Sequence, residues 1–113
     1  MAFDVKSEIT KGGIAKVTLS GELDASVAPL FKAEVEKMSG GDVKRLVLLM
    51  RDLEYIASAG IRVLVFAKQK MGAEIDIYVV APQAQVLETF EMTGLTHSLV
   101  IMKRYDIAKI ETL

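Results

Sequence analysis

Two short, continuous runs of apolar residues constrain the fold of this chain more than any other feature. The first covers Leu46–Met50, and the second covers Ile75–Val80 and ends at Ala81-Pro82. Such runs are typical of strands in a sheet that is covered on both faces, so the first should be a central strand. Between them, Ala59–Met71 is long enough for a crossover helix of about 20 Å. Strand, helix and strand in this order predict a parallel pair with a right-handed crossover.

The residues before the first run predict an antiparallel hairpin. Apolar and polar residues alternate over Phe3–Ile9 and again over Ala15–Leu19, which is the period of a half-buried strand. Between these segments lies Lys11-Gly12-Gly13, whose glycines accept the positive φ values of a tight turn. Residues 21–24, Gly-Glu-Leu-Asp, are expected to end the second strand.

Three helices and a last strand complete the predicted set. Apolar residues recur at helical spacing over Ser26–Met38. Ser26 is expected to cap this helix, Pro29 fits its first turn, and Gly40-Gly41 should end it.

The C-terminal part predicts a helix over residues 83–92 that ends at Gly94, a strand over 99–102 and an amphipathic helix over 105–113. The predicted order is ββαβαβαβα. We therefore expect one α/β domain over residues 1–113, with a mixed sheet of four or five strands and helices packed against it.

Composition and charge exclude several classes of function. The chain has 113 residues, no cysteine and one histidine, so a disulfide scaffold, a thiolate nucleophile and a cysteine-ligated metal are excluded. A net charge of -1 without a basic run makes nucleic acid an unexpected partner. The N-terminal residues lack a signal-peptide pattern, and no apolar run reaches the roughly 20 residues of a membrane span. We expect a cytoplasmic protein with no membrane partner.

The segment Asp52–Ile61 is the most informative for function. It is expected to leave a buried strand, cross a short loop and enter a helix at Ser58, which stands between small residues. The Ser58 hydroxyl could cap this helix by accepting from the amide of Gly60 or Ile61. A phosphate at this position would lie beside amide donors and the positive end of the helix dipole. Two interpretations stay open: a serine used only as a cap, and a phosphorylation switch.

Over nearly its whole length the chain resembles the STAS family, and within it the bacterial anti-sigma factor antagonists. The resemblance rests on the order of the hairpin, Gly21–Asp24, Asp52-Leu53 leading to Ile56–Gly60, and Met92–Leu95. It implies a protein without catalytic activity, cofactor or metal that binds an anti-sigma factor with serine kinase activity and so releases a sigma factor. It also implies that phosphorylation of Ser58 blocks this binding and that a serine phosphatase restores it.

Two positions depart from the family pattern. The family typically has Asp-Ser-Ser/Thr-Gly where this chain has Ala57-Ser58-Ala59-Gly60. Without the second hydroxyl, Ser58 is the only candidate acceptor in the motif. Without the carboxylate, the surface that a kinase meets loses one charge and up to four acceptor positions, so kinase recognition is expected to be altered or absent.

The predicted partner surface joins two segments. Asp24 corresponds to the acidic residue of the family's Gly-Glu-Leu-Asp motif, and its loop should approach Ser58; an ordinary turn residue is the alternative. Arg62 follows one helical turn after Ser58 and is expected to tune partner choice, although it could instead pair with Glu54 or remain solvated. The predicted partner-binding residues are Glu22, Asp24, Ala57, Ser58, Ala59, Gly60 and Arg62.

The helix after Ser58 has more apolar residues than one stripe accommodates. Ile61, Leu64 and Val65 are expected to face the sheet, which leaves Val63 and Phe66 outside that stripe. These two are either exposed contacts for a partner or buried under the C-terminal helix.

Other functions find less support in the residues. Ser58 lacks the immediate strand-to-helix turn of a hydrolase nucleophile elbow, and His97 is expected in a loop away from it. The alternative to the antagonist is a STAS scaffold that is not phosphorylated, or a module that senses a small ligand or nucleotide. A weak homodimer is compatible with either function.

Overall fold

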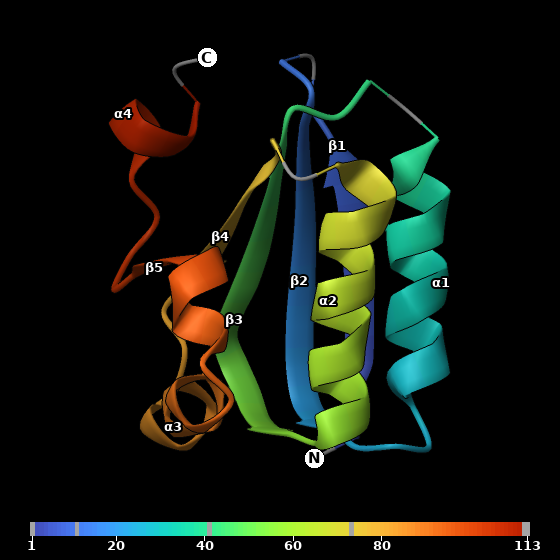
Figure 1. Ribbon diagram of the computed structural model, residues 1–113, viewed down its shortest axis with the longest axis vertical. Helices are drawn as coiled ribbons and strands as arrows, with labels where there is room; N and C mark the ends of the chain where they lie inside the picture. Colours follow the sequence, from blue (N-terminus) through green and yellow to red (C-terminus); the bar gives the residue numbers. More distant parts are fainter. Residues whose placement is uncertain (1, 11, 41, 73, 112–113) are drawn as a thin grey trace.

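A five-stranded sheet forms the centre of the computed structural model, which describes residues 2–10, 12–40, 42–72 and 74–111 (Figure 1). The elements in chain order are β1 (Asp4–Ile9), β2 (Ile14–Leu23), α1 (Ala28–Ser39), β3 (Arg45–Ile56), α2 (Ser58–Met71), β4 (Asp76–Val80), α3 (Ala84–Met92), the 3₁₀ helix η1 (Leu95–Ser98), β5 (Val100–Met102) and α4 (Ile107–Ile110). Lys11 and Gly41 of the predicted turns, and the last two residues of the predicted C-terminal helix, lie outside the described residues.

The sheet confirms the predicted α/β class and connectivity. Its strand order is β1-β2-β3-β4-β5, with β1 antiparallel to β2 and each later pair parallel. The hairpin and the parallel pair around the crossover helix are therefore confirmed. β3 lies in the middle, and Leu46, Val47 and Leu48 are all fully buried. The first apolar run is the central strand because both of its faces are covered.

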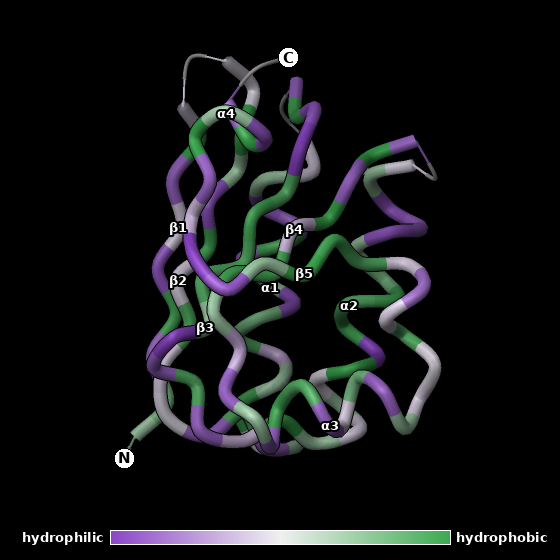
Figure 2. Tube along the Cα trace, turned by 90° about the vertical axis from the view of Figure 1, so that its left-hand side faces the viewer, coloured by the Kyte–Doolittle hydropathy of each residue, from purple (hydrophilic) through white to green (hydrophobic). Residues whose placement is uncertain are grey.

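The two faces of the sheet are covered unequally. Helices α1, α2 and α3 lie on one face, where Phe31, Leu64 and Phe90 form part of the main core (Figure 1). The opposite face holds a smaller cluster that includes Val47 and is covered in part by Ile110 of α4. Figure 2 shows that the strands and the inner sides of the helices carry most of the hydrophobic segments.

Both central strands extend further than the sequence predicts. β2 continues through Gly21 and ends at Leu23, so the strand does end within residues 21–24, but three residues later than a break at Gly21 would place it. Its pairing with β3 contains two register shifts, and Gly21 adopts a φ of 81°, which glycine tolerates. β3 continues to Ile56, so the expected loop after Met50 is wrong. Backbone hydrogen bonds between the strands stabilise both extensions.

The C-terminal helix is shorter than predicted. The pattern over residues 105–113 indicated an amphipathic helix, whereas α4 is a single turn of four residues. The Asp106 side chain caps this turn by accepting a hydrogen bond of 3.2 Å from the Lys109 amide. The Arg45 guanidinium donates to the carbonyl of Ile110, which fastens the turn to the sheet.

Helix α2 begins in close contact with the ends of β2 and β3, and Gly60 makes that contact possible. A Cβ atom at Gly60 would lie 2.8 Å from Ile56 Cγ1 and 2.9 Å from Leu23 Cδ2. Carbon atoms in proteins do not pack at such distances, since van der Waals contact begins near 3.5 Å. The first turn of α2 can therefore approach the sheet only with glycine at this position.

We expect Gly60→Ala to destabilise the protein although alanine favours helix. The added methyl group would displace α2 from Leu23 and Ile56, at a cost of about 2 kcal/mol, and lower the melting temperature by about 10 °C. Gly40→Ala is the matched control, because Gly40 has a φ of -80° and nothing within 4 Å of the added atom. The control should be neutral or stabilising by about 0.4–1 kcal/mol. Equal melting temperatures for the two variants would contradict the close contact.

Candidate functional site

The carboxyl ends of β2 and β3 bring two loops together. Leu23 pairs in register with Ile56, and the Ala57 amide donates a hydrogen bond of 2.9 Å to the Leu23 carbonyl. The segment that begins at Asp24 therefore leaves the sheet beside the start of α2. Residues that are more than thirty positions apart in the chain meet at this edge.

Ser58 is the first residue of α2, not its cap. The N-cap is Ala57, whose carbonyl accepts hydrogen bonds of 2.9 Å from the Gly60 amide and 3.1 Å from the Ile61 amide. The predicted capping role of the Ser58 hydroxyl was therefore wrong, because β3 extends to Ile56 and leaves only Ala57 to link strand and helix. Ser58 is exposed, and no described residue bonds its hydroxyl. The hydroxyl is thus accessible and unoccupied.

Asp24 organises the turn between β2 and α1. Its Oδ1 accepts hydrogen bonds of 2.9 Å from the Ser26 amide, 2.6 Å from the Ser26 hydroxyl and 3.3 Å from the Val27 amide. The hydrogen bond from the Ser26 hydroxyl is the main reason why the pKa of Asp24 lies below its usual value. The predicted cap at Ser26 was wrong, since the N-cap is Val27, whose own side chain makes no capping hydrogen bond. Asp24 is instead an ionised, exposed carboxylate that is fixed by its own turn.

Glu22 and Tyr55 lie near the ends of β2 and β3, next to the Asp24 turn and Ser58. The two residues are partners in the parallel pairing of β2 with β3, and the Tyr55 side chain is 48% exposed. Glu22 is also exposed. Tyr55 was missed from the sequence because the expected loop hid its position at the end of a strand.

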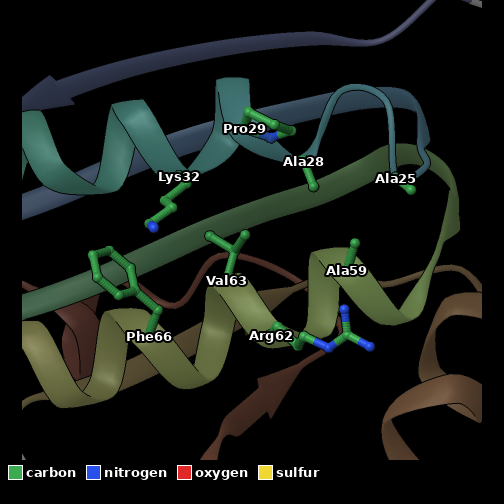
Figure 3. Close-up of a pocket in the computed structure, with 8 residues that line it drawn as sticks. All are labelled: Ala25, Ala28, Pro29, Lys32, Ala59, Arg62, Val63 and Phe66. Atoms are coloured by element: carbon green, nitrogen blue, oxygen red, sulfur yellow. The ribbon is translucent and has the colours of Figure 1, made fainter.

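A groove runs between α1 and α2 beside these loops (Figure 3). Its volume is about 510 Å³. We call it the α1–α2 groove, and its lining consists of Ala25, Ala28, Pro29, Lys32, Ala59, Arg62, Val63 and Phe66. The sequence indicated only the α2 side of this groove, because helix periodicity does not reveal which helix packs against which.

The packing of α2 corrects the prediction for its apolar residues. Val63 is buried and Phe66 is half-buried, and both face α1 rather than the C-terminal helix (Figure 3). Val65, which was expected to face the sheet, is 42% exposed. Arg62 is exposed, and within the described part of the chain it has no ion pair with Glu54 or any other residue.

The described residues contain no candidate metal centre. No group of three or more histidine, aspartate or glutamate residues among them could hold a metal ion. His97 lies exposed in the 3₁₀ helix η1 and not in the expected loop, and this helix is a different element from the one that holds Ser58. None of the helices in the described ranges is long and apolar enough to cross a membrane.

Solved structures with the same fold include anti-sigma factor antagonists. The antagonist from Mycobacterium paratuberculosis has a TM-score of 0.86 and 22% identity, over 98% of this chain and 96% of that one. Unphosphorylated SpoIIAA has a TM-score of 0.78 and 17% identity, over 94% and 91% of the two chains. The Bacillus cell fate determinant SpoIIAA in its phosphorylated form has a TM-score of 0.70 and 18% identity, over 97% of each chain.

No curated protein matches this chain. The family model of the STAS domain does match, over residues 7–108, which include both loops of the site and both helices of the groove. The chain therefore belongs to the STAS domain family.

Proposed function

We propose that this protein is an anti-sigma factor antagonist that acts in the cytoplasm. It binds an anti-sigma factor with serine kinase activity and thereby releases a sigma factor. The observation that carries this proposal is the exposed, unbonded hydroxyl of Ser58 beside the turn organised by Asp24. Structures of the same fold include those of anti-sigma factor antagonists, among them SpoIIAA in unphosphorylated and phosphorylated forms.

Phosphorylation of Ser58 would change the surface without disturbing the core. The first amides of a helix lack intrahelical acceptors, and the helix dipole favours negative charge there. A phosphoserine would add a charge of roughly -2 at this end of α2. Arg62 follows four residues later and extends along α2 toward the start of the helix (Figure 3). Residues at this spacing are neighbours, so the phosphate could draw the Arg62 guanidinium away from a partner.

The alanines on both sides of Ser58 restrict which residue can be phosphorylated and which kinases can recognise it. Ala57 and Ala59 are half-buried and carry no hydroxyl or carboxylate, so Ser58 is the only acceptor in the motif. A kinase that requires an acidic residue before the serine would not modify this chain. In that case, binding to the anti-sigma factor would be controlled by the amounts of the two proteins instead of by the kinase and a serine phosphatase.

The proposal is tested by incubating the protein with ATP and each kinase-type anti-sigma factor encoded in the same genome. We expect the intact mass to rise by about 80 Da with one of them. Ser58→Ala should show no such gain. Tight binding without any gain in mass would support an antagonist that is not phosphorylated. The absence of both binding and phosphorylation would contradict the proposed function.

A charge at position 58 should block binding while the fold is retained. We expect Ser58→Asp to weaken the affinity for the anti-sigma factor by about a hundredfold, because the new carboxylate adds negative charge to the interface and draws Arg62 away from the partner. Its melting temperature should not fall, since an acidic residue in the first helical turn stabilises by about 0.3–1 kcal/mol. Ser58→Asn has the same size without the charge and should bind more tightly than Ser58→Asp. Equal affinities of these two variants would show that charge is not what the partner senses.

The Asp24 carboxylate should contribute its charge to binding of the anti-sigma factor, in addition to fixing the shape of its turn. Its Oδ1 is occupied by the turn, whereas no described residue bonds its Oδ2. Asp24→Asn keeps an acceptor for the turn and removes the charge. We expect slightly lower melting at pH 7, because the lowered pKa of Asp24 means that its charge stabilises the turn, and an affinity lower by about tenfold. Asp24→Ala should lose the turn as well. If Asp24→Asn binds like the wild type in a calorimetric titration, Asp24 serves the turn alone.

A further inference from the structure

The α1–α2 groove is continuous with the surface proposed to bind the anti-sigma factor. Ala25 directly follows Asp24, Ala59 directly follows Ser58, and both line the groove. A partner that contacts the Asp24 turn and Ser58 therefore reaches one end of this groove. The inference below rests on the proposed function and extends its surface to α1.

The lining of the groove combines apolar side chains with two cations. Ala28 and Val63 are almost fully buried, and Phe66 is half-buried. Lys32 and Arg62 are the polar side chains of the lining, which includes no acidic residue. The Lys32 ammonium group lies 4.8 Å from the centre of the Phe66 ring, so the ring is bordered by positive charge.

Neither cation of the groove is paired with an acceptor in the part of the chain that the structure describes, unlike Lys16 and Arg45. Lys16 lies 3.9 Å from a carboxylate oxygen of Glu111, and Arg45 donates to a backbone carbonyl. By contrast, Lys32 has only its contact with the Phe66 ring, and Arg62 has no partner within the described residues. The groove thus holds two positive charges that no acceptor within the described chain compensates, although the whole chain has a net charge of -1.

We propose that the α1–α2 groove receives a segment of the anti-sigma factor that places an apolar side chain between acidic residues. The apolar side chain packs against Val63 and Phe66, and the carboxylates pair with Lys32 and Arg62. Interfaces of this kind derive their affinity from buried apolar and aromatic anchors and from arginine at the border. A nucleotide is the competing occupant, since its phosphates would also pair with Lys32 and Arg62, but the lining offers no side-chain acceptor to its base.

Charge reversal tests this assignment. We expect Lys32→Glu and Arg62→Glu each to weaken the affinity for the anti-sigma factor by about tenfold, and the double variant by about a hundredfold, in calorimetric titrations at low salt. Lys70→Glu is the matched control, because Lys70 is exposed on α2 and lies outside the groove. It changes the net charge equally and should alter the affinity by less than about threefold. Circular dichroism melting should be similar for the groove variants, since the substituted side chains are exposed, and slightly lower for Lys70→Glu, because an acidic residue in the last turn of α2 opposes the helix dipole.

A compensating charge change in the anti-sigma factor tests the assignment of the groove most directly. One acidic residue of the anti-sigma factor, when changed to lysine, should restore the binding of Arg62→Glu while it weakens the binding of the wild type. Failure of the wild type to bind any anti-sigma factor would overturn the proposed function itself.

Binding of the wild type together with undiminished binding of the double variant would overturn only the assignment of the groove. The melting temperature of the wild type and of the double variant should also be measured with ATP. The assignment would be overturned if ATP stabilised only the wild type while the double variant kept its affinity for the anti-sigma factor. That result would make the groove a site for small anions.

Discussion

Parallel hydrogen bonding between β2 and β3 continues to Leu23 and Ile56, at the carboxyl ends of both strands, and the site depends on it. The Ala57 amide adds one more bond to the Leu23 carbonyl, and Gly60 lets α2 approach the same two side chains. As a result, the turn after β2 and the start of α2 have a fixed relative position. Strands that ended several residues earlier would leave both segments as independent loops.

The elements that depend on local pattern could be predicted from the sequence. The apolar run at residues 46–50, the alternation over residues 3–9 and the helical spacing over residues 59–71 each identified an element of the right type. Strand ends were less predictable. Residues 21–23 and 51–56 look like loop in the sequence, and they are strand because the neighbouring strand supplies hydrogen bonds that no local pattern records.

The site, too, could be predicted only where it depends on local sequence. The small neighbours of Ser58 indicated an accessible serine, and Ser58 is exposed. Its capping role and that of Ser26 could not be predicted correctly, because a cap depends on where the strand before it ends. The α1–α2 groove escaped prediction for a similar reason: α2 packs against both the sheet and α1, so its buried sector is broader than one stripe and includes Val63.

The cap of α2 has a consequence for how such a protein can change over evolution. The backbone carbonyl of Ala57 accepts the bonds that close the first turn, so the fold makes no use of the side chain at position 58. A serine can appear or disappear there at little cost in folding free energy. The proposed regulation by a kinase would therefore be gained or lost in a lineage by a single codon change, while the scaffold stays the same.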